Sequence, residues 1–285
     1  MLITLQVSYE KNMKIISLNI NNFGGSTECK PRQDDIKYAD LPKDYIGNSK
    51  EIYCDDVKKF QRDSKRLAVA EKIYQKMVEE NPDIIIFHEY DINSPANDVL
   101  KNLLEKRGYN LIPPNQIAYN TIKEQGTRWS ISVIFIKKHF KFSTFQSPTT
   151  YYARWNQIKI GNLTLIGIHM KYDMKFWNEL ITFYKNNKEE HLLFMGDFNA
   201  TDNPRNDCAK KVKEEFDEVF AQGAIDVWIE KGNRPIKTFI IGTRLDYAIV
   251  SPIVLPEITN IEIDQFFIEE KISDHAAVNV SLKNQ

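Results

Sequence analysis

The chain has 285 residues, with Lys+Arg 38 against Asp+Glu 39, so its formal net charge is -1, and 42% of its residues are hydrophobic. This composition is typical of a folded globular protein and excludes a disordered chain. The balanced charge excludes a strong overall attraction to nucleic acid or to an anionic lipid surface.

The three cysteines are far apart and show no metal-ligand spacing, which is typical of reduced thiols. The N-terminal stretch lacks the basic region and cleavage site of a signal peptide, and no apolar run is long enough to cross a bilayer. We therefore expect a cytoplasmic protein without membrane insertion. The length suits a single domain at residues 13–285, preceded at residues 1–12 by an extension or an edge strand.

In the first half of the chain, apolar runs bounded by turn residues predict strands, and a helical hydrophobic period predicts helices. These elements are a strand at residues 14–20, a helix at residues 62–80, a strand at residues 84–89, a helix at residues 95–106 and a strand at residues 130–136. Residues 24–61 are polar and irregular, and a segment of this length predicts a substrate-facing insertion that sets substrate choice.

The second half is richer in strands. Its predicted elements are a hairpin of residues 152–160 and 163–169 turning at Gly161-Asn162, a helix at residues 175–186, a strand within residues 191–200, a helix at residues 209–221, and strands at residues 246–250 and 276–282. This order of elements predicts an α/β fold, specifically a four-layer sandwich of two mixed β-sheets packed face to face with helices on the outside.

Acidic, amide and imidazole side chains recur at the ends of these apolar strands. Strand ends next to loops present side chains to a ligand, whereas burying an unpaired charge there would be costly. The residues are Asn19 and Asn21 in LNINN, Glu89 in IIIFHEYD, His169 in IGIHMKYD, Asp197 and Asn199 in MGDFN, Asp246 in TRLDYAIV, and Asp274 with His275 in ISDHAAV. We interpret them as parts of one site.

The ordered pair GDFN and SDH is the most specific of these patterns, because either motif alone occurs by chance in many chains. With the other motifs, the sequence resembles the endonuclease/exonuclease/phosphatase superfamily, which includes pancreatic-type deoxyribonucleases, abasic-site endonucleases, sphingomyelinases and inositol polyphosphate 5-phosphatases. The resemblance runs in order from about Met13 to Leu282. It implies that residues 13–285 form a catalytic domain that hydrolyses phosphate esters.

The resemblance also implies a divalent metal, Mg²⁺ or Mn²⁺, since hard cations take oxygen ligands and neutralise phosphate oxygens. The residues that it implies for metal binding are Asn19, Asn21, Glu89 and Asp274. Asp197 matches the family's aspartate that orients or activates the attacking water. Asn199 matches the amide that binds phosphate, and alternation along an extended segment places it on the same face as Asp197.

Two histidines complete the implied catalytic set. His275 matches the histidine that contacts the scissile phosphate, and Asp246 matches the carboxylate that holds its ring and favours the imidazolium. His169 matches the second histidine of the deoxyribonuclease, sphingomyelinase and 5-phosphatase branches, which is the implied general acid for the leaving group. Arg154 lies where several members place a phosphate-contacting arginine, and the alternative for it is a surface ion pair.

Two positions depart from the family pattern. The residue before the metal-binding glutamate is commonly glutamine, but here it is His88, either a packing residue or a group that supports a metal ligand. The pancreatic enzymes hold their second histidine with a glutamate on the strand after the central loop, where this chain reads GTRWSIS. The sequence therefore does not identify the partner of His169.

We expect a metal-dependent hydrolase of phosphodiester bonds that acts as a nuclease on DNA or RNA, with no obligate protein partner. One alternative is a phosphatase or phospholipase-like enzyme acting on a small head group of the inositol phosphate or sphingomyelin type. Another is an inactive binding scaffold. The basic pairs Lys137-Lys138 and Lys210-Lys211 predict solvated faces, which weighs against a processive nuclease.

Overall fold

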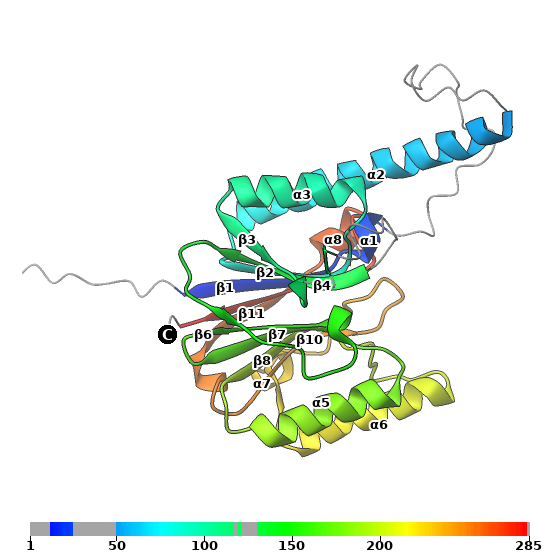
Figure 1. The fold of residues 1–285 in the computed structure, drawn as a ribbon. Helices are drawn as coiled ribbons and strands as arrows, with labels where there is room; N and C mark the ends of the chain where they lie inside the picture. Colours follow the sequence, from blue (N-terminus) through cyan, green and yellow to red (C-terminus); the bar gives the residue numbers. More distant parts are fainter. Residues whose placement is uncertain (1–11, 25–49, 117–118, 121–129, 284–285) are drawn as a thin grey trace, which may run out of the picture.

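The computed structural model describes residues 12–24, 50–116, 119–120 and 130–283. Within these residues, twelve strands form two six-stranded sheets, and the sheets lie face to face between outer layers of helices (Figure 1). This arrangement confirms the predicted α/β sandwich. Among the described residues, no helix is both long and apolar enough to cross a lipid bilayer.

The first sheet has the strand order β11-β12-β1-β2-β4-β3, and the second has the order β5-β6-β7-β8-β10-β9. The first sheet consists of β1 (Met13–Asn19), β2 (Ile84–Asp91), β3 (Tyr109–Ile112), β4 (Ser130–Lys137), β11 (Ile258–Asp264) and β12 (Ala277–Leu282). The second consists of β5 (Ser143–Thr144), β6 (Trp155–Ile160), β7 (Leu163–His169), β8 (Leu192–Asp197), β9 (Ile225–Asp226) and β10 (Asp246–Val250). Both sheets are mixed, because β1 pairs with β2 and β7 with β8 in parallel.

Three hydrophobic clusters hold the layers together. The central cluster fills the space between the sheets and includes Ile86 and Ile134 from the first sheet and Leu165 and Met195 from the second. The other two clusters lie under helices on the outer faces of the two sheets. Burial of this apolar surface on both faces explains why the central strands are continuous apolar runs instead of alternating ones.

Long helices cover the outer faces. Helices α2 (Lys50–Glu80) and α3 (Pro95–Lys106) cover the first sheet, and α5 (Met174–Asn187) and α6 (Asp207–Ala221) cover the second (Figure 1). The remaining short helical segments are α1 (Asn21–Gly24), η4 (Tyr152–Arg154), α7 (Val227–Glu230), η5 (Leu255–Glu257) and α8 (Phe266–Glu269).

The predicted insertion at residues 24–61 needs a correction. Helix α2 begins at Lys50, twelve residues before the predicted start at Arg62, so residues 50–61 are helical and not irregular. The polar composition of this first part hid the helical period. Residues 25–49 of the insertion and residues 1–11 of the N-terminal extension lie outside the described residues.

Candidate active site

One row of residues crosses the end of the second sheet. The pairing of β7, β8 and β10 places His169 beside Asp197 and Asp197 beside Asp246, so strands from distant parts of the chain bring the three side chains together. All three residues are buried. Parallel pairing of β7 with β8 is what aligns the ends of these two strands at the same edge.

The first sheet contributes Asn19 and Glu89. Asn19 ends β1 opposite His88, and Glu89 follows within an irregularity of β2 between Phe87 and Tyr90. Glu89 has a φ of 52°, a left-handed conformation that is rare for this residue type. A β-bulge re-aims a side chain relative to regular alternation, and this one brings the Glu89 carboxylate to the opening of the site. Asn22 Nδ2 donates to Glu89 Oε2 at 2.8 Å.

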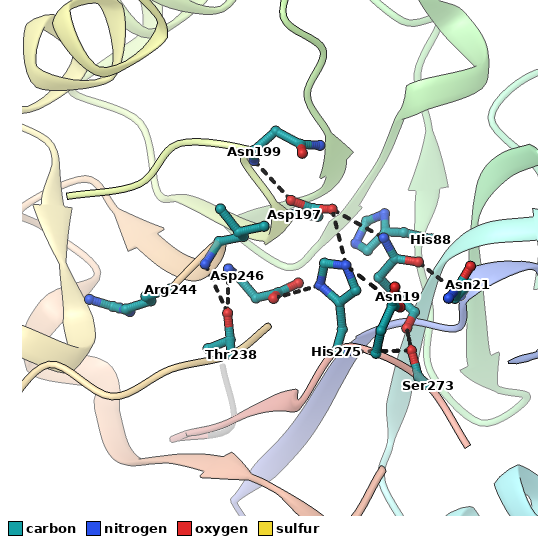
Figure 2. Close-up of polar contacts among 12 residues, drawn as sticks. Asn19, Asn21, His88, Asp197, Asn199, Thr238, Arg244, Asp246, Ser273 and His275 are labelled. Carbon is teal, nitrogen blue, oxygen red and sulfur yellow. Dashed lines mark hydrogen bonds and ion pairs between the residues drawn. The ribbon is translucent and has the colours of Figure 1, made fainter. Parts of the chain in front are cut away.

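Asn19 connects the two sheets. Its Nδ2 donates to Asp197 Oδ2 at 3.1 Å, and its Oδ1 accepts from the backbone N–H of Asn21 at 2.9 Å (Figure 2). The Ser273 hydroxyl donates to the Asn19 carbonyl at 2.6 Å. Asn21, a predicted metal residue, therefore enters this network through its backbone.

Figure 2 shows the His275 ring between Asp246 and Asp197. His275 Nδ1 lies 2.9 Å from Asp246 Oδ2, and its Nε2 lies 3.8 Å from Asp197 Oδ2. Burial alone would lower the pKa of His275, but the charges of Asp246 and Asp197 outweigh it and raise the pKa above its ordinary value. The predicted Asp246 and His275 pair is therefore present and favours the imidazolium.

Asp197 lies at the centre of the network. Burial raises the pKa of its carboxyl group, an effect that the nearby His275 opposes and Asp246 reinforces. Its Oδ1 accepts the Asn199 backbone N–H at 2.8 Å. Asn199 Nδ2 donates to the Met170 carbonyl at 3.0 Å, and because an amide nitrogen has two N–H groups, one donor remains for a ligand.

His169 has a cationic partner. Arg154 Nη1 lies 3.0 Å from His169 Nδ1, and His169 Nε2 faces Asp197 Oδ2 at 3.6 Å and Glu89 Oε1 at 3.8 Å. Burial lowers the pKa of His169 well below its ordinary value, and the Arg154 charge lowers it further. The partner that the sequence leaves open is thus a half-buried guanidinium. Among the described residues, Arg154 is half-buried against His169 and is not part of a surface ion pair, which was the alternative considered for it.

His88 lies between the sheets beneath these residues. It is fully buried, with Ser17 Oγ 3.2 Å from Nε2 and Ser132 Oγ 2.9 Å from Nδ1. Gly196 makes room for it, because a Cβ there would lie 2.6 Å from His88 Nε2 and 1.9 Å from the Ile168 carbonyl oxygen. Burial lowers the pKa of His88 to about 3. These contacts favour the packing role over metal support.

Two carboxylates that line the pocket offer the oxygen ligands that a hard cation prefers. Glu89 and Asp274 both line the pocket, and their side chains are 28% and 31% exposed, which leaves them accessible. Among the described side chains, Asp274 Oδ1 is buried and accepts no hydrogen bond, although His275 Nε2 lies 3.9 Å away. Burying a carboxylate oxygen that accepts no hydrogen bond is costly, and a bound cation would offset this cost. Asp274 therefore suits the role of a cation ligand.

A second group of potential ligands consists of Asp197, Asp246 and His275, whose ligand atoms lie within 4.8 Å of one another. The hydrogen bond between Asp246 and His275 already uses this space. A protonated imidazole has no lone pair for a metal, so the raised pKa of His275 disfavours a cation there.

The network opens into a pocket of about 360 Å³. Five predicted site residues line it, namely Glu89, Asp197, Asn199, Asp274 and His275. The pocket is also lined by the polar side chains of Tyr172 and Arg205 and by the apolar side chains of Phe239, Ile241 and Leu245. A larger hollow of about 650 Å³ lies over α5 and contains none of the predicted residues.

Sequence reasoning missed several residues that hold the site. Thr238 Oγ1 accepts the backbone N–H groups of Leu245 and Asp246, both at 2.9 Å, and the Thr238 carbonyl accepts from Ala276 at 2.8 Å. Thr238 thereby joins the strand of Asp246 to the segment of His275. Serine and threonine residues in loops do not belong to a recognisable sequence motif. Their hydrogen-bond partners can lie far away in the sequence, so no local signal identifies residues such as Thr238.

Comparison with known proteins supports the fold. No protein-family profile and no curated protein matches the chain. Solved structures do: an AP endonuclease from Archaeoglobus fulgidus has 15% identity and a TM-score of 0.61, with 95% of this chain and 99% of that chain covered.

A 3′-5′ exonuclease from Neisseria meningitidis has 16% identity and a TM-score of 0.60, with 95% of this chain and 100% of that chain covered. The endonuclease domain of a telomere-specific non-LTR retrotransposon has 13% identity and a TM-score of 0.58, with 96% and 100% covered. The chain therefore has the endonuclease/exonuclease/phosphatase fold, as the motifs predicted. At these identities the likeness concerns the fold alone.

Proposed function

We propose that this chain is a divalent-metal-dependent hydrolase of phosphodiester bonds that acts as a nuclease on DNA or RNA. The observation that carries the proposal is the convergence of two carboxylates and two histidines from both sheets, where Glu89, Asp197 and His275 line one open pocket and His169 lies against the first two. The structural neighbours support this class, since they include endonucleases, an exonuclease and a 3′ phosphatase bound to a product DNA hairpin.

Glu89, Asn19 and Asp274 would hold Mg²⁺ or Mn²⁺, and the bound cation would neutralise phosphate oxygens during attack. Asp197 accepts a proton from the attacking water, a role that suits a carboxylate whose pKa burial raises toward neutrality. The free N–H of Asn199 binds a phosphate oxygen. His275 carries a proton on Nε2, so it stabilises negative charge and protonates the leaving oxygen.

A substrate panel in Mg²⁺ and in Mn²⁺ tests the proposal. Supercoiled plasmid is expected to be nicked, and Glu89→Gln is expected to abolish both nicking and the saturable binding of Mn²⁺ measured by calorimetry. The exposed Glu214→Gln on α6 is the matched control and is expected to keep both. Turnover of inositol phosphates or sphingomyelin without nicking would move the assignment to the head-group alternative, and absence of turnover and of metal binding would reject hydrolysis.

A further inference from the structure

Beside the pocket, the cationic side chain of Arg154 contacts the ring of His169. The hairpin of β6 and β7 pairs Trp155 with Ile168, which makes Arg154 and His169 neighbours across the strand ends. Arg154 Nη1 and His169 Nδ1 are 3.0 Å apart. Arg154 is half-buried and His169 is buried, so water competes little for this contact.

Donor and acceptor chemistry fixes the ring at this contact. A guanidinium has only N–H donors and no acceptor, so the ring nitrogen facing it must be the acceptor. Nδ1 of His169 therefore carries no proton, and the ring proton lies on Nε2. This nitrogen points to the reacting region, 3.6 Å from Asp197 Oδ2 and 3.8 Å from Glu89 Oε1.

The strand that carries the supporting glutamate in the pancreatic enzymes offers no carboxylate to His169 here. The only side chain of the GTRWSIS stretch that faces the buried histidines in the described residues is Ser132, whose hydroxyl pairs with His88. Among the described residues, the side chain that lies against His169 Nδ1 is the cationic Arg154. The opposite charge reverses the direction of the hydrogen bond.

We propose that Arg154 is a positioning residue that fixes the Nε2-protonated tautomer of His169, so that His169 donates a hydrogen bond to a phosphate oxygen and does not protonate the leaving group. The second part rests on the proposed function. It leaves proton transfer to Asp197 and His275, and it means that Arg154 acts through His169 instead of binding phosphate by itself.

The tautomer is tested directly by NMR of the full chain labelled with ¹⁵N in its five histidines, without metal or substrate. His169→Gln identifies the His169 signals. Wild type and Arg154→Lys, which keeps a cationic donor, are expected to show an unprotonated Nδ1 and a protonated Nε2. Arg154→Met, which removes the donor, is expected to lose this preference. A protonated Nδ1 in the wild type would overturn the proposal whether or not the protein cleaves any substrate.

A double-mutant cycle on plasmid nicking tests the functional part. Loss of one hydrogen bond to a charged group predicts that Arg154→Met and His169→Gln each lower kcat by about 10- to 100-fold, with little change in KM. The double variant is expected to be no slower than His169→Gln alone, because both changes remove the same interaction. Multiplicative losses with a raised KM would instead make Arg154 an independent phosphate ligand. The exposed Arg107→Met controls for the lost charge.

Discussion

The two histidines of the pocket lie on the two flanks of Asp197 and meet opposite charges. On one flank, His275 Nδ1 faces the Asp246 carboxylate at 2.9 Å, and the pKa of His275 is raised. On the other flank, His169 Nδ1 faces the Arg154 guanidinium at 3.0 Å, and the pKa of His169 is lowered. Both rings are buried, so burial by itself would lower both pKa values.

The difference shows that the partner on Nδ1 decides what each ring can do. A carboxylate accepts a hydrogen bond from the ring N–H and favours the doubly protonated ring, whereas a guanidinium donates a hydrogen bond and leaves the ring with one proton. Two identical side chains near one carboxylate can thus divide the work of a reaction. One holds a transferable proton, and the other holds a fixed hydrogen bond.

The largest effect is expected from Asp246→Asn, which removes the charge that sustains the His275 imidazolium while keeping the side-chain shape. General acid–base contributions predict a fall in kcat of about 100- to 10,000-fold. The measurement is the rate of plasmid nicking at saturating substrate. The loss should exceed that of Arg154→Met, because only the His275 flank supplies a proton. An equal loss on both flanks, or activity as high as in the exposed control Asp217→Asn, would contradict the division of roles.

Gly196→Ala tests strand β8, which carries Asp197 between the two histidines. Gly196 precedes Asp197, has a φ of 150°, and would place a Cβ 1.9 Å from the Ile168 carbonyl oxygen. A backbone clash combined with a strained conformation predicts a loss of about 3 kcal/mol or more in the free energy of unfolding.

Gly223→Ala is the matched control for this change. Gly223 also has a positive φ of 99°, but a Cβ there meets nothing within 4 Å. Backbone strain alone predicts a loss of about 1 kcal/mol. Urea denaturation of the two variants gives both values, and equal losses would mean that the close packing of β8 against β7 and His88 does not limit the site.

Much of the fold follows from the sequence, because its central strands are apolar on both faces. The expected bounds of α3 and β10 agree with the structure, those of β1 and α5 differ by one residue at each end, and β4 ends one residue later than expected. The missed strands are short or polar: β3 has four residues, and β11 alternates buried and exposed positions at a sheet edge. Their pairing partners, not their own composition, define them.

The site was predictable to the level of residue types but not of contacts. Asp197, Asp246 and His275 stand at strand ends, which the sequence shows. The bulge at Glu89 depends on how β2 pairs with β4, and the contact of Arg154 with His169 depends on the β6 and β7 register. Register is a property of two strands together, so a single segment does not reveal which charge meets which ring.

The smallest expected effect concerns His88, which lies beneath both flanks. Burial is the main cause that lowers its pKa from the ordinary value of 6.5 to about 3, and the charges of His275 and Arg154 contribute to this shift. Below pH 6.5 the unfolded chain binds a proton that folded His88 does not bind, so this residue makes the protein less stable as the pH falls. Between pH 8 and about pH 5.5, the contribution is about 1.4 kcal/mol.

His88→Gln keeps an amide that can pair with Ser17 and Ser132 but removes this titration. The free energy of unfolding of the variant should therefore fall less between these two pH values than that of the wild type, by about the same 1.4 kcal/mol. Urea denaturation at each pH measures the difference, and the exposed His139→Gln is the control. Parallel pH profiles for wild type and His88→Gln would show that the pKa of His88 is not lowered in the folded protein, which would contradict the prediction.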